Sequence, residues 1–176
     1  MGYKVAVLEP SSDCPAGQVA ERLIEAGYTD SIALGQLAAL CSAVTTEFEN
    51  VPAETAAFLE PLVPLAPGAR ALATAQDRLT EKDFIAGLGI PVAPYAAVDG
   101  EASLVTAVAH TGLPAILKTR RLGYDGKGQV RIDPGSNLVK ALRELGEAPA
   151  IAEGFVHFDR EISVIAARGW SGETAV

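Results

Sequence analysis

A proline-rich segment, residues 61–68, divides the chain into two parts whose predicted elements follow different orders. Its three prolines each lack a backbone N–H, so neither a helix nor a central strand can continue through it. Before it, the pattern reads strand, helix, strand, helix, which is typical of a parallel sheet with crossover helices. After it, two predicted strands are joined by a glycine-rich loop that is too short for a crossover, which predicts antiparallel pairing. The fold class is therefore α/β followed by α+β.

The first part contains a short β-branched stretch and several helical spacings. We expect strands at 4–9 and 43–48, helices at 16–26, 32–40 and 53–60, and a short edge strand at 62–65. A unit of this order normally carries a glycine-rich phosphate turn after its first strand, and none follows Glu9. Either the unit binds no dinucleotide, or its first strand here is the second strand of a larger sheet.

The second part mixes helices with strands. We expect helices at 69–75, 79–88, 101–111 and 137–145, an extended piece at 92–98, and strands at 114–119, 129–132, 150–155 and 161–167. Glycines or prolines end most of these stretches, as helix and strand boundaries usually require. No internal repeat or low-complexity tract interrupts the pattern.

Charge and composition exclude several classes. The net charge of −8 comes from residues 1–100, which hold 13 acidic and 5 basic side chains, whereas residues 101–176 are neutral. An acidic chain disfavours nucleic-acid binding, and no apolar run approaches the ~20 residues of a membrane span. Cys14 and Cys41 stand apart, without metal-ligand spacing. We therefore expect a cytoplasmic protein without a nucleic-acid or membrane partner.

The densest chemical signal is the basic, glycine-rich stretch 118–129. Lys118 ends an apolar segment and faces a loop with several glycines, whose N–H groups can approach phosphate oxygens while the amine neutralises charge. It matches neither a Walker A loop nor a dinucleotide fingerprint. A hairpin loop with glycine turns explains the stretch about as well, and a nucleic-acid-binding loop is a third, weaker reading.

Two further places carry candidate ligand-binding groups. Arg78 opens a predicted helix, where a surface salt bridge is the simpler interpretation. Glu153 and Glu161 flank an apolar connector that could hold an adenosine, with the backbone at the adenine edge and Glu161 at the ribose. Two strands joined by a polar corner would look the same. His110 and His157 have no partners at metal-ligand or triad spacing.

Several motifs together resemble a known family. They are EFENVP (47–52), QDRLTEK (76–82), LKTRR (117–121), GYDGKGQ (123–129) and FDREIS (158–163). In this order they are similar to the 5-(carboxyamino)imidazole ribonucleotide synthases, the ATPase subunit of phosphoribosylaminoimidazole carboxylase, in the ATP-grasp superfamily. The resemblance covers nearly the whole chain, and the block 123–129 separates this family from biotin carboxylase and other ATP-grasp relatives.

The resemblance implies a domain plan and an activity. It implies an incomplete, Rossmann-like pre-ATP-grasp domain over 1–68, and the N-terminal part of an ATP-grasp domain over 69–176. The latter would hold the lid, at about 112–157, and the start of the catalytic subdomain. The implied enzyme is a carbon–nitrogen ligase of de novo purine biosynthesis. It would carboxylate 5-aminoimidazole ribonucleotide with bicarbonate and ATP, through carboxyphosphate.

The resemblance also implies roles for individual residues. ATP would be held by Arg78, Lys118, Glu153, Gly154, Phe155, Val156 and Glu161. The aminoimidazole ribonucleotide would be held by Glu47, Tyr124, Asp125 and Lys127. Lys118, Asp125 and Lys127 would be the catalytic residues. Mg²⁺ would lie on the ATP phosphates, with no ligand in this chain and its ligands expected beyond residue 176. The complete protein would be a homodimer.

One departure from the family pattern leaves an alternative open. The family's opening strand and glycine-rich turn are missing, so the chain resembles a family member that is incomplete at both ends. The alternative to an active ligase is a truncated, non-catalytic ATP-grasp remnant or a nucleotide-binding fragment.

Overall fold

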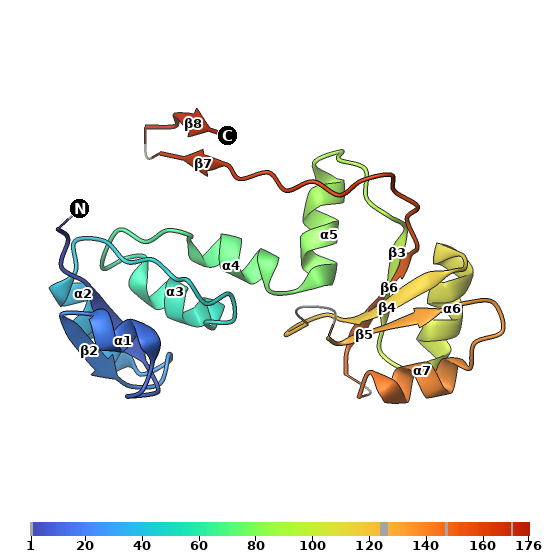
Figure 1. The fold of residues 1–176 in the computed structure, drawn as a ribbon, viewed down its shortest axis with the longest axis horizontal. Helices are drawn as coiled ribbons and strands as arrows, with labels where there is room; N and C mark the ends of the chain where they lie inside the picture. Colours follow the sequence, from blue (N-terminus) through green and yellow to red (C-terminus); the bar gives the residue numbers. More distant parts are fainter. Residues whose placement is uncertain (1, 124–126, 147, 170) are drawn as a thin grey trace.

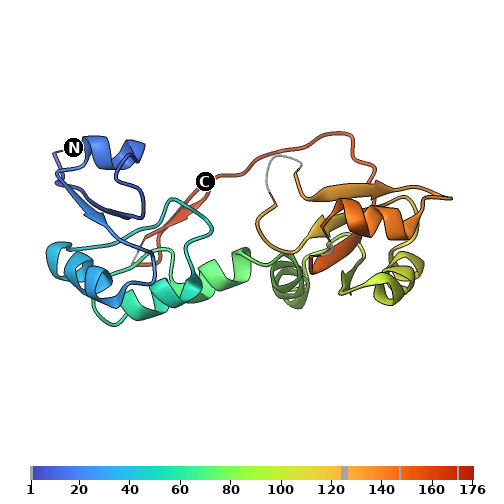
Figure 2. The same cartoon turned by 90° about the horizontal axis from the view of Figure 1, so that it is seen from below.

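The computed structural model describes residues 2–123, 127–146, 148–169 and 171–176. The helices are α1 (Pro15–Val19), α2 (Ser31–Leu40), α3 (Ala53–Leu59), α4 (Ala69–Ala75), α5 (Arg78–Gly87), α6 (Glu101–Thr111) and α7 (Leu138–Glu144). The strands are β1 (Ala6–Glu9), β2 (Arg22–Glu25), β3 (Tyr95–Val98), β4 (Ala115–Thr119), β5 (Gln129–Ile132), β6 (Ala150–Gly154), β7 (Ala167–Arg168) and β8 (Thr174–Ala175). They form two units at opposite ends of an elongated molecule, with α4 and α5 between them (Figures 1 and 2).

The first unit is built on a short parallel pair of strands. β1 and β2 pair with Ala6 opposite Arg22, and α2 packs on β1. The core cluster that unites α2, α3 and α4 contains Leu34, Leu59 and Leu72. Because Leu72 belongs to α4, the first of the two connecting helices is anchored in the core of this unit.

The second unit is a four-stranded antiparallel sheet in the order β3-β6-β4-β5. Helices α6 and α7 contact this sheet and each other, and Figure 1 shows them together at the right of the molecule. Leu117 of β4 and Ala152 of β6 are fully buried in one cluster with Leu104 of α6. Since side chains alternate along a strand, the neighbours of Leu117 and Ala152 must point to the other face of the sheet. That face holds the candidate site.

Several predicted elements are confirmed. The helices expected at 32–40, 53–60, 69–75, 79–88, 101–111 and 137–145 are present as α2 to α7, within one or two residues at their ends. The strands on either side of the glycine-rich loop pair in antiparallel fashion, as the short connection required. Asp77 and Asn137 cap α5 and α7 with their side chains, which explains where those two helices begin.

The predicted helix at 16–26 is wrong. The chain forms the short helix α1, turns to an extended conformation at Ala20, and then pairs as strand β2 with β1. The apolar spacing that suggested a helix instead places Ile24, the buried residue of β2, against the core formed with α2. Parallel pairing is therefore confirmed for the first unit, but the partner of β1 is Arg22–Glu25.

The predicted strands at 43–48 and 62–65 reduce to a single bridge. Val44 pairs with Leu65 in parallel fashion; the Val44 N–H donates to Pro64 and the Ala66 N–H donates to Val44. Pro64 and Pro67 have no N–H to donate, so the ladder cannot extend further along this segment.

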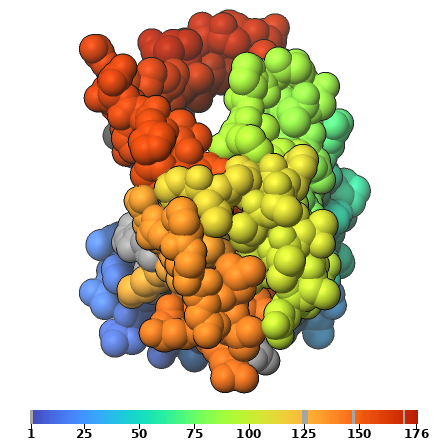
Figure 3. All heavy atoms as spheres, turned by 90° about the vertical axis from the view of Figure 1, so that its right-hand side faces the viewer, coloured from blue at the N-terminus to red at the C-terminus, as the bar shows by residue number. Residues whose placement is uncertain are grey.

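The predicted strand at 161–167 is also wrong. Residues 161–166 lie in neither helix nor strand, and Ala167–Arg168 pairs only with Thr174–Ala175 as a small hairpin. The segment runs away from the sheet, and Figure 3 shows an opening between it and the region of α5. Ile162 and Ile165 are exposed there. A β-prone sequence without a neighbouring strand in the described structure has no partner for its backbone groups, so no ladder forms.

No helix among the described residues combines the length and the apolar character needed to cross a membrane.

Candidate functional site

Two predicted site residues meet on the sheet face opposite α6 and α7. Lys118 of β4 lies opposite Ile151 of β6, and Glu153 lies opposite Ile116, so Lys118 and Glu153 are diagonal neighbours on one face. The Lys118 ammonium is 3.0 Å from the Glu153 carboxylate. The antiparallel register of β4 and β6 therefore brings together two residues that lie far apart in the sequence.

A third charged group, Lys82 of α5, completes this cluster. Its ammonium lies 3.5 Å from the same oxygen of Glu153 and 5.8 Å from the centroid of the Tyr95 ring. The Glu153 residue is only 8% exposed, and its Oε1 atom has no hydrogen-bond partner among the described residues. A buried carboxylate needs such compensation, and a buried acceptor without a partner fits a ligand that brings a donor.

Arg78 and Glu47 line a pocket at the junction of the two units. Its volume is about 470 Å³. The first unit contributes Glu47 and Asn50, α5 contributes Arg78, and the segment after β4 contributes Arg120 and Gly123. The wall formed by the first unit carries Glu47 and Glu49, whereas the wall formed by α5 and the segment after β4 carries Arg78, Arg120 and Glu81. The pocket can therefore hold a polar ligand that carries both donors and an anionic group. Two predicted residues from different parts of the sequence are thus brought together.

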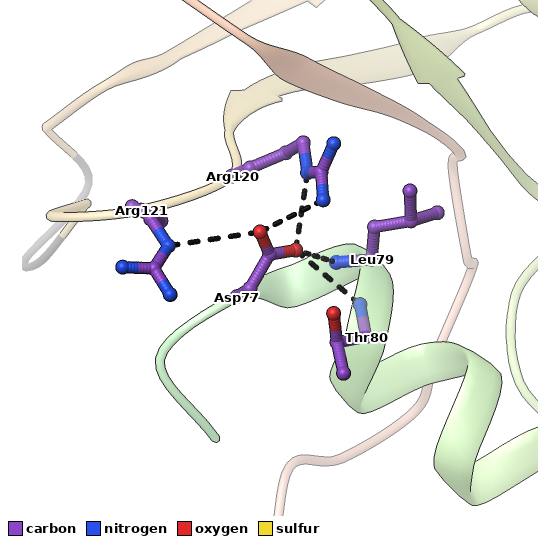
Figure 4. Close-up of polar contacts among 5 residues, drawn as sticks. All are labelled: Asp77, Leu79, Thr80, Arg120 and Arg121. Atoms are coloured by element: carbon purple, nitrogen blue, oxygen red, sulfur yellow. Dashed lines mark hydrogen bonds and ion pairs between the residues drawn. The ribbon is translucent and has the colours of Figure 1, made fainter. Parts of the chain in front are cut away.

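A buried aspartate holds the basic wall of this pocket (Figure 4). Asp77 Oδ2 accepts a hydrogen bond from Arg120 Nη2 at 2.8 Å, Asp77 Oδ1 accepts one from Arg120 Nε at 3.1 Å, and Arg121 Nε lies 3.7 Å from Oδ2. The Oδ1 atom also accepts from the amides of Leu79 and Thr80 at the start of α5. This two-point contact fixes the plane of the Arg120 guanidinium.

The pKa of Asp77 lies below its ordinary value. Burial acts in the opposite direction and would raise the pKa, but the hydrogen bonds and charge of Arg120, together with the helix-cap amides, outweigh it. Asp77 is therefore ionised near neutral pH and presents a fixed negative charge to both arginines.

The predicted adenine connector lies at the end of β6. The amides of Gly154 and Phe155 donate to the carbonyls of Pro94 and Pro114 at 2.8 and 3.0 Å, so both amides are engaged within the domain. The Phe155 ring contacts the Arg131 guanidinium, 4.5 Å from its centroid, and packs edge-on with the ring of His157. Val156, next in the chain, is half exposed.

Two of the remaining predicted residues, Glu161 and Lys127, are exposed. Glu161 lies in the extended segment that leaves the sheet. Lys127 is exposed near the end of the glycine-rich loop. Tyr124 and Asp125 lie outside the described residues. Across the described ranges, no group of three or more His, Cys, Asp or Glu side chains could hold a metal ion.

Sequence reasoning did not assign three residues that the structure places at the site, namely Gln76, Asp77 and Lys82. All three belong to the QDRLTEK motif. The helix-capping signal of Asp77 was visible in the sequence, but its contact with Arg120 was not. No sequence signal paired Lys82 with Glu153, because that contact depends on how α5 lies over the sheet.

Family models match both units. A ribonucleotide synthetase preATP-grasp domain matches residues 1–76, and an ATP-grasp domain matches residues 83–176.

Individual relatives match almost the whole chain. An N5-carboxyaminoimidazole ribonucleotide synthase of Brucella melitensis is 49% identical over 177 residues, covering 99% of this chain and 49% of that protein. A crystal structure of an N5-carboxyaminoimidazole ribonucleotide synthetase with ADP has a TM-score of 0.92 at 41% identity, covering 99% of this chain and 46% of the other. The Staphylococcus aureus enzyme with ADP has a TM-score of 0.92 at 38% identity, with coverages of 99% and 47%. The chain spans about half the length of the relatives it matches.

Proposed function

The chain belongs to the ATP-grasp family, and from this premise we propose that it is part of an N5-carboxyaminoimidazole ribonucleotide synthase. The proposed reaction is the ATP-dependent carboxylation of 5-aminoimidazole ribonucleotide with bicarbonate, through carboxyphosphate, in purine biosynthesis. Because the chain spans about half of its relatives, the activity belongs to the complete protein. We propose that this protein is a cytoplasmic homodimer.

The observation that carries the proposal is the cluster of Lys118, Lys82 and Glu153. Two ammonium groups converge on one buried carboxylate, so the cluster carries a net positive charge beside the glycine-rich loop. That charge suits an anionic phosphate, and the unpartnered Glu153 Oε1 suits a donor such as an exocyclic amine. We propose that Lys118 binds an ATP phosphate and that Glu153 lies at the adenine. Relatives crystallised with ADP support nucleotide binding by the complete protein.

The other assignments extend this proposal. Gly154, Phe155 and Val156 would border the adenine, Arg78 would lie along the nucleotide, and Glu161 would hold the ribose. Glu47, Tyr124, Asp125 and Lys127 would hold the aminoimidazole ribonucleotide, for which the pocket of Glu47 and Arg78 offers the space. Asp125 and Lys127 would act with Lys118 in catalysis. A closing loop would exclude water, which a reactive acyl phosphate requires.

Mg²⁺ is part of the proposal for the complete protein only. The described part of this chain offers no cluster of ligands for it. Its contribution would be to offset charge on the transferring phosphoryl group. The residues of this chain would bind and orient the substrates.

The proposal is tested on the complete reading frame. Purified enzyme should release phosphate from ATP only when both 5-aminoimidazole ribonucleotide and bicarbonate are present. Phosphate release that is independent of either substrate would refute it. Lys118→Ala should raise the KM for ATP or abolish turnover, whereas Lys140→Ala, on the exposed side of α7, should leave both unchanged. Wild-type kinetics in Lys118→Ala would remove the role assigned to that residue.

A further inference from the structure

Two adjacent residues at the junction between the units hold opposite walls of the pocket. Gln76 is the last residue before the chain turns from α4 into α5, and Asp77 is the N-cap of α5. Gln76 binds the first unit, and Asp77 binds the second. Two residues adjacent in the sequence therefore each hold one of the two units that line the pocket of Glu47 and Arg78.

On the first wall, one side-chain amide binds two backbone carbonyls. Gln76 Nε2 donates to the Glu49 carbonyl at 2.7 Å and to the Val51 carbonyl at 2.5 Å. An amide nitrogen has two hydrogens, so both are used in these bonds. The segment around Glu47 has neither helix nor strand to hold it, and Val51 is buried at its far end. Gln76 thus fixes the loop that presents Glu47.

On the second wall, Asp77 and the backbone of Arg78 both hold Arg120. The carboxylate binds the Arg120 guanidinium at two points, and the Arg78 N–H donates to the Arg120 carbonyl at 3.0 Å. The Arg120 N–H in turn donates to Pro149, next to β6. The second wall is therefore fixed by several bonds, whereas the first depends on one side chain at this junction.

We propose that Gln76 is a positioning residue that orients Glu47 toward the imidazole ribonucleotide. Its loss would weaken the binding of that substrate and leave the binding of ATP unchanged. This inference deepens the proposed function and rests on it. Its physical basis is the separation of the two sites: the Gln76 amide holds the Glu47 loop, whereas Lys118 and Glu153 are held by the sheet. Loss of the two hydrogen bonds should release the loop and leave the sheet unchanged.

The kinetic test uses the complete protein with Gln76→Met, which keeps the side-chain length and removes both donors. We expect the KM for 5-aminoimidazole ribonucleotide to rise about tenfold, which corresponds to losing two ordinary hydrogen bonds, while the KM for ATP stays within about twofold. The control is Gln36→Met on the exposed face of α2, which should change neither KM. An unchanged ribonucleotide KM, or an equal rise in both, would overturn the inference.

A second measurement does not depend on turnover. Hydrogen–deuterium exchange on the same variant should be faster in residues 45–52 and unchanged in residues 115–119, relative to wild type. Uniform acceleration, or none, would overturn the positioning role even if the enzyme is active. If wild type needs neither the ribonucleotide nor bicarbonate for phosphate release, the proposed function fails, and the exchange result still decides whether Gln76 holds the loop.

Discussion

The Lys118 ammonium lies 3.0 Å from the Glu153 carboxylate, on the sheet face opposite α6 and α7. Lys82, from a different element, lies 3.5 Å from the same oxygen. Each lysine side chain is about four-fifths buried or more, and Glu153 more so. A buried carboxylate is costly without compensation, and both lysines compensate the charge of Glu153. If one lysine bound a ligand, the other would still compensate the charge of Glu153.

This shared compensation predicts non-additive stability. In this chain, Lys118→Met and Lys82→Met should each lower the free energy of unfolding moderately, and the double variant by about 1–3 kcal/mol more than their sum. Adding Glu153→Gln to the double variant should recover much of the loss, because no unpaired charge remains. Urea denaturation measures all four variants. Lys140→Met, which breaks only the exposed pair with Glu144, should cost no more than about 0.5 kcal/mol. Strict additivity would contradict the shared role.

The Asp77 contacts predict a pH-dependent loss. Asp77→Asn should destabilise the chain by about 1–3 kcal/mol at neutral pH, because it weakens charge-assisted hydrogen bonds to Arg120. The pKa of Asp77 is depressed in the folded state, so its contribution is complete above the ordinary value of 3.8 and is lost as the pH falls through the lower folded pKa. The difference in the free energy of unfolding between wild type and Asp77→Asn should therefore become smaller as the pH falls.

Unfolding curves between neutral and acidic pH would measure this difference. The matched control is Asp133→Asn, since Asp133 binds Arg131 at an exposed site and should matter less. If the difference in the free energy of unfolding between wild type and Asp77→Asn became larger as the pH fell, Asp77 would not be stabilised in its charged form.

The raised pKa of Tyr28 predicts a contribution to stability that is lost at high pH rather than at low pH. Burial, together with the hydrogen bond and negative charge of Glu9, raises the pKa of Tyr28 to about 12. The neutral phenol is therefore favoured in the folded state, and its contribution is complete below the ordinary value of 10.0 and lost as the pH rises through about 12. Tyr28→Phe should cost about 1 kcal/mol at neutral pH. In an alkaline titration followed by phenolate absorbance, the step due to Tyr28 at high pH should be missing from the variant. An unchanged step at high pH would refute the assignment.

The core of the second unit predicts that substitutions at two adjacent residues of α6 differ in their effect on stability. Leu104→Ala should lower the free energy of unfolding by about 2–5 kcal/mol, because Leu104 is fully buried on the face of α6 that packs on β3 and β6. Val105→Ala, at an exposed position on the same helix, should change it by less than about 1 kcal/mol. Thermal unfolding compares the two. Equal effects would mean that α6 does not pack as described.

Local features were predictable wherever neighbouring residues settle the structure. The helix at 101–111 and the caps at Asp77 and Asn137 depend on spacing and side chains a few residues apart. Antiparallel pairing across the glycine-rich loop followed from its length. The strand at 22–25 was missed because its hydrogen bonds come from β1, and tertiary pairing overrode the helical spacing.

The sequence by itself determined the order of most elements, the motifs, and Lys118, Glu153, Arg78 and Glu47 as candidates. The tertiary structure decided which of them meet. The register of β4 against β6 placed Lys118 beside Glu153, and the position of α5 added Lys82. The junction at Gln76 and Asp77 brought Glu47 and Arg78 to one pocket. Ion pairs and hydrogen bonds of this kind act over a few ångströms in space, and only the packing of distant segments sets those distances.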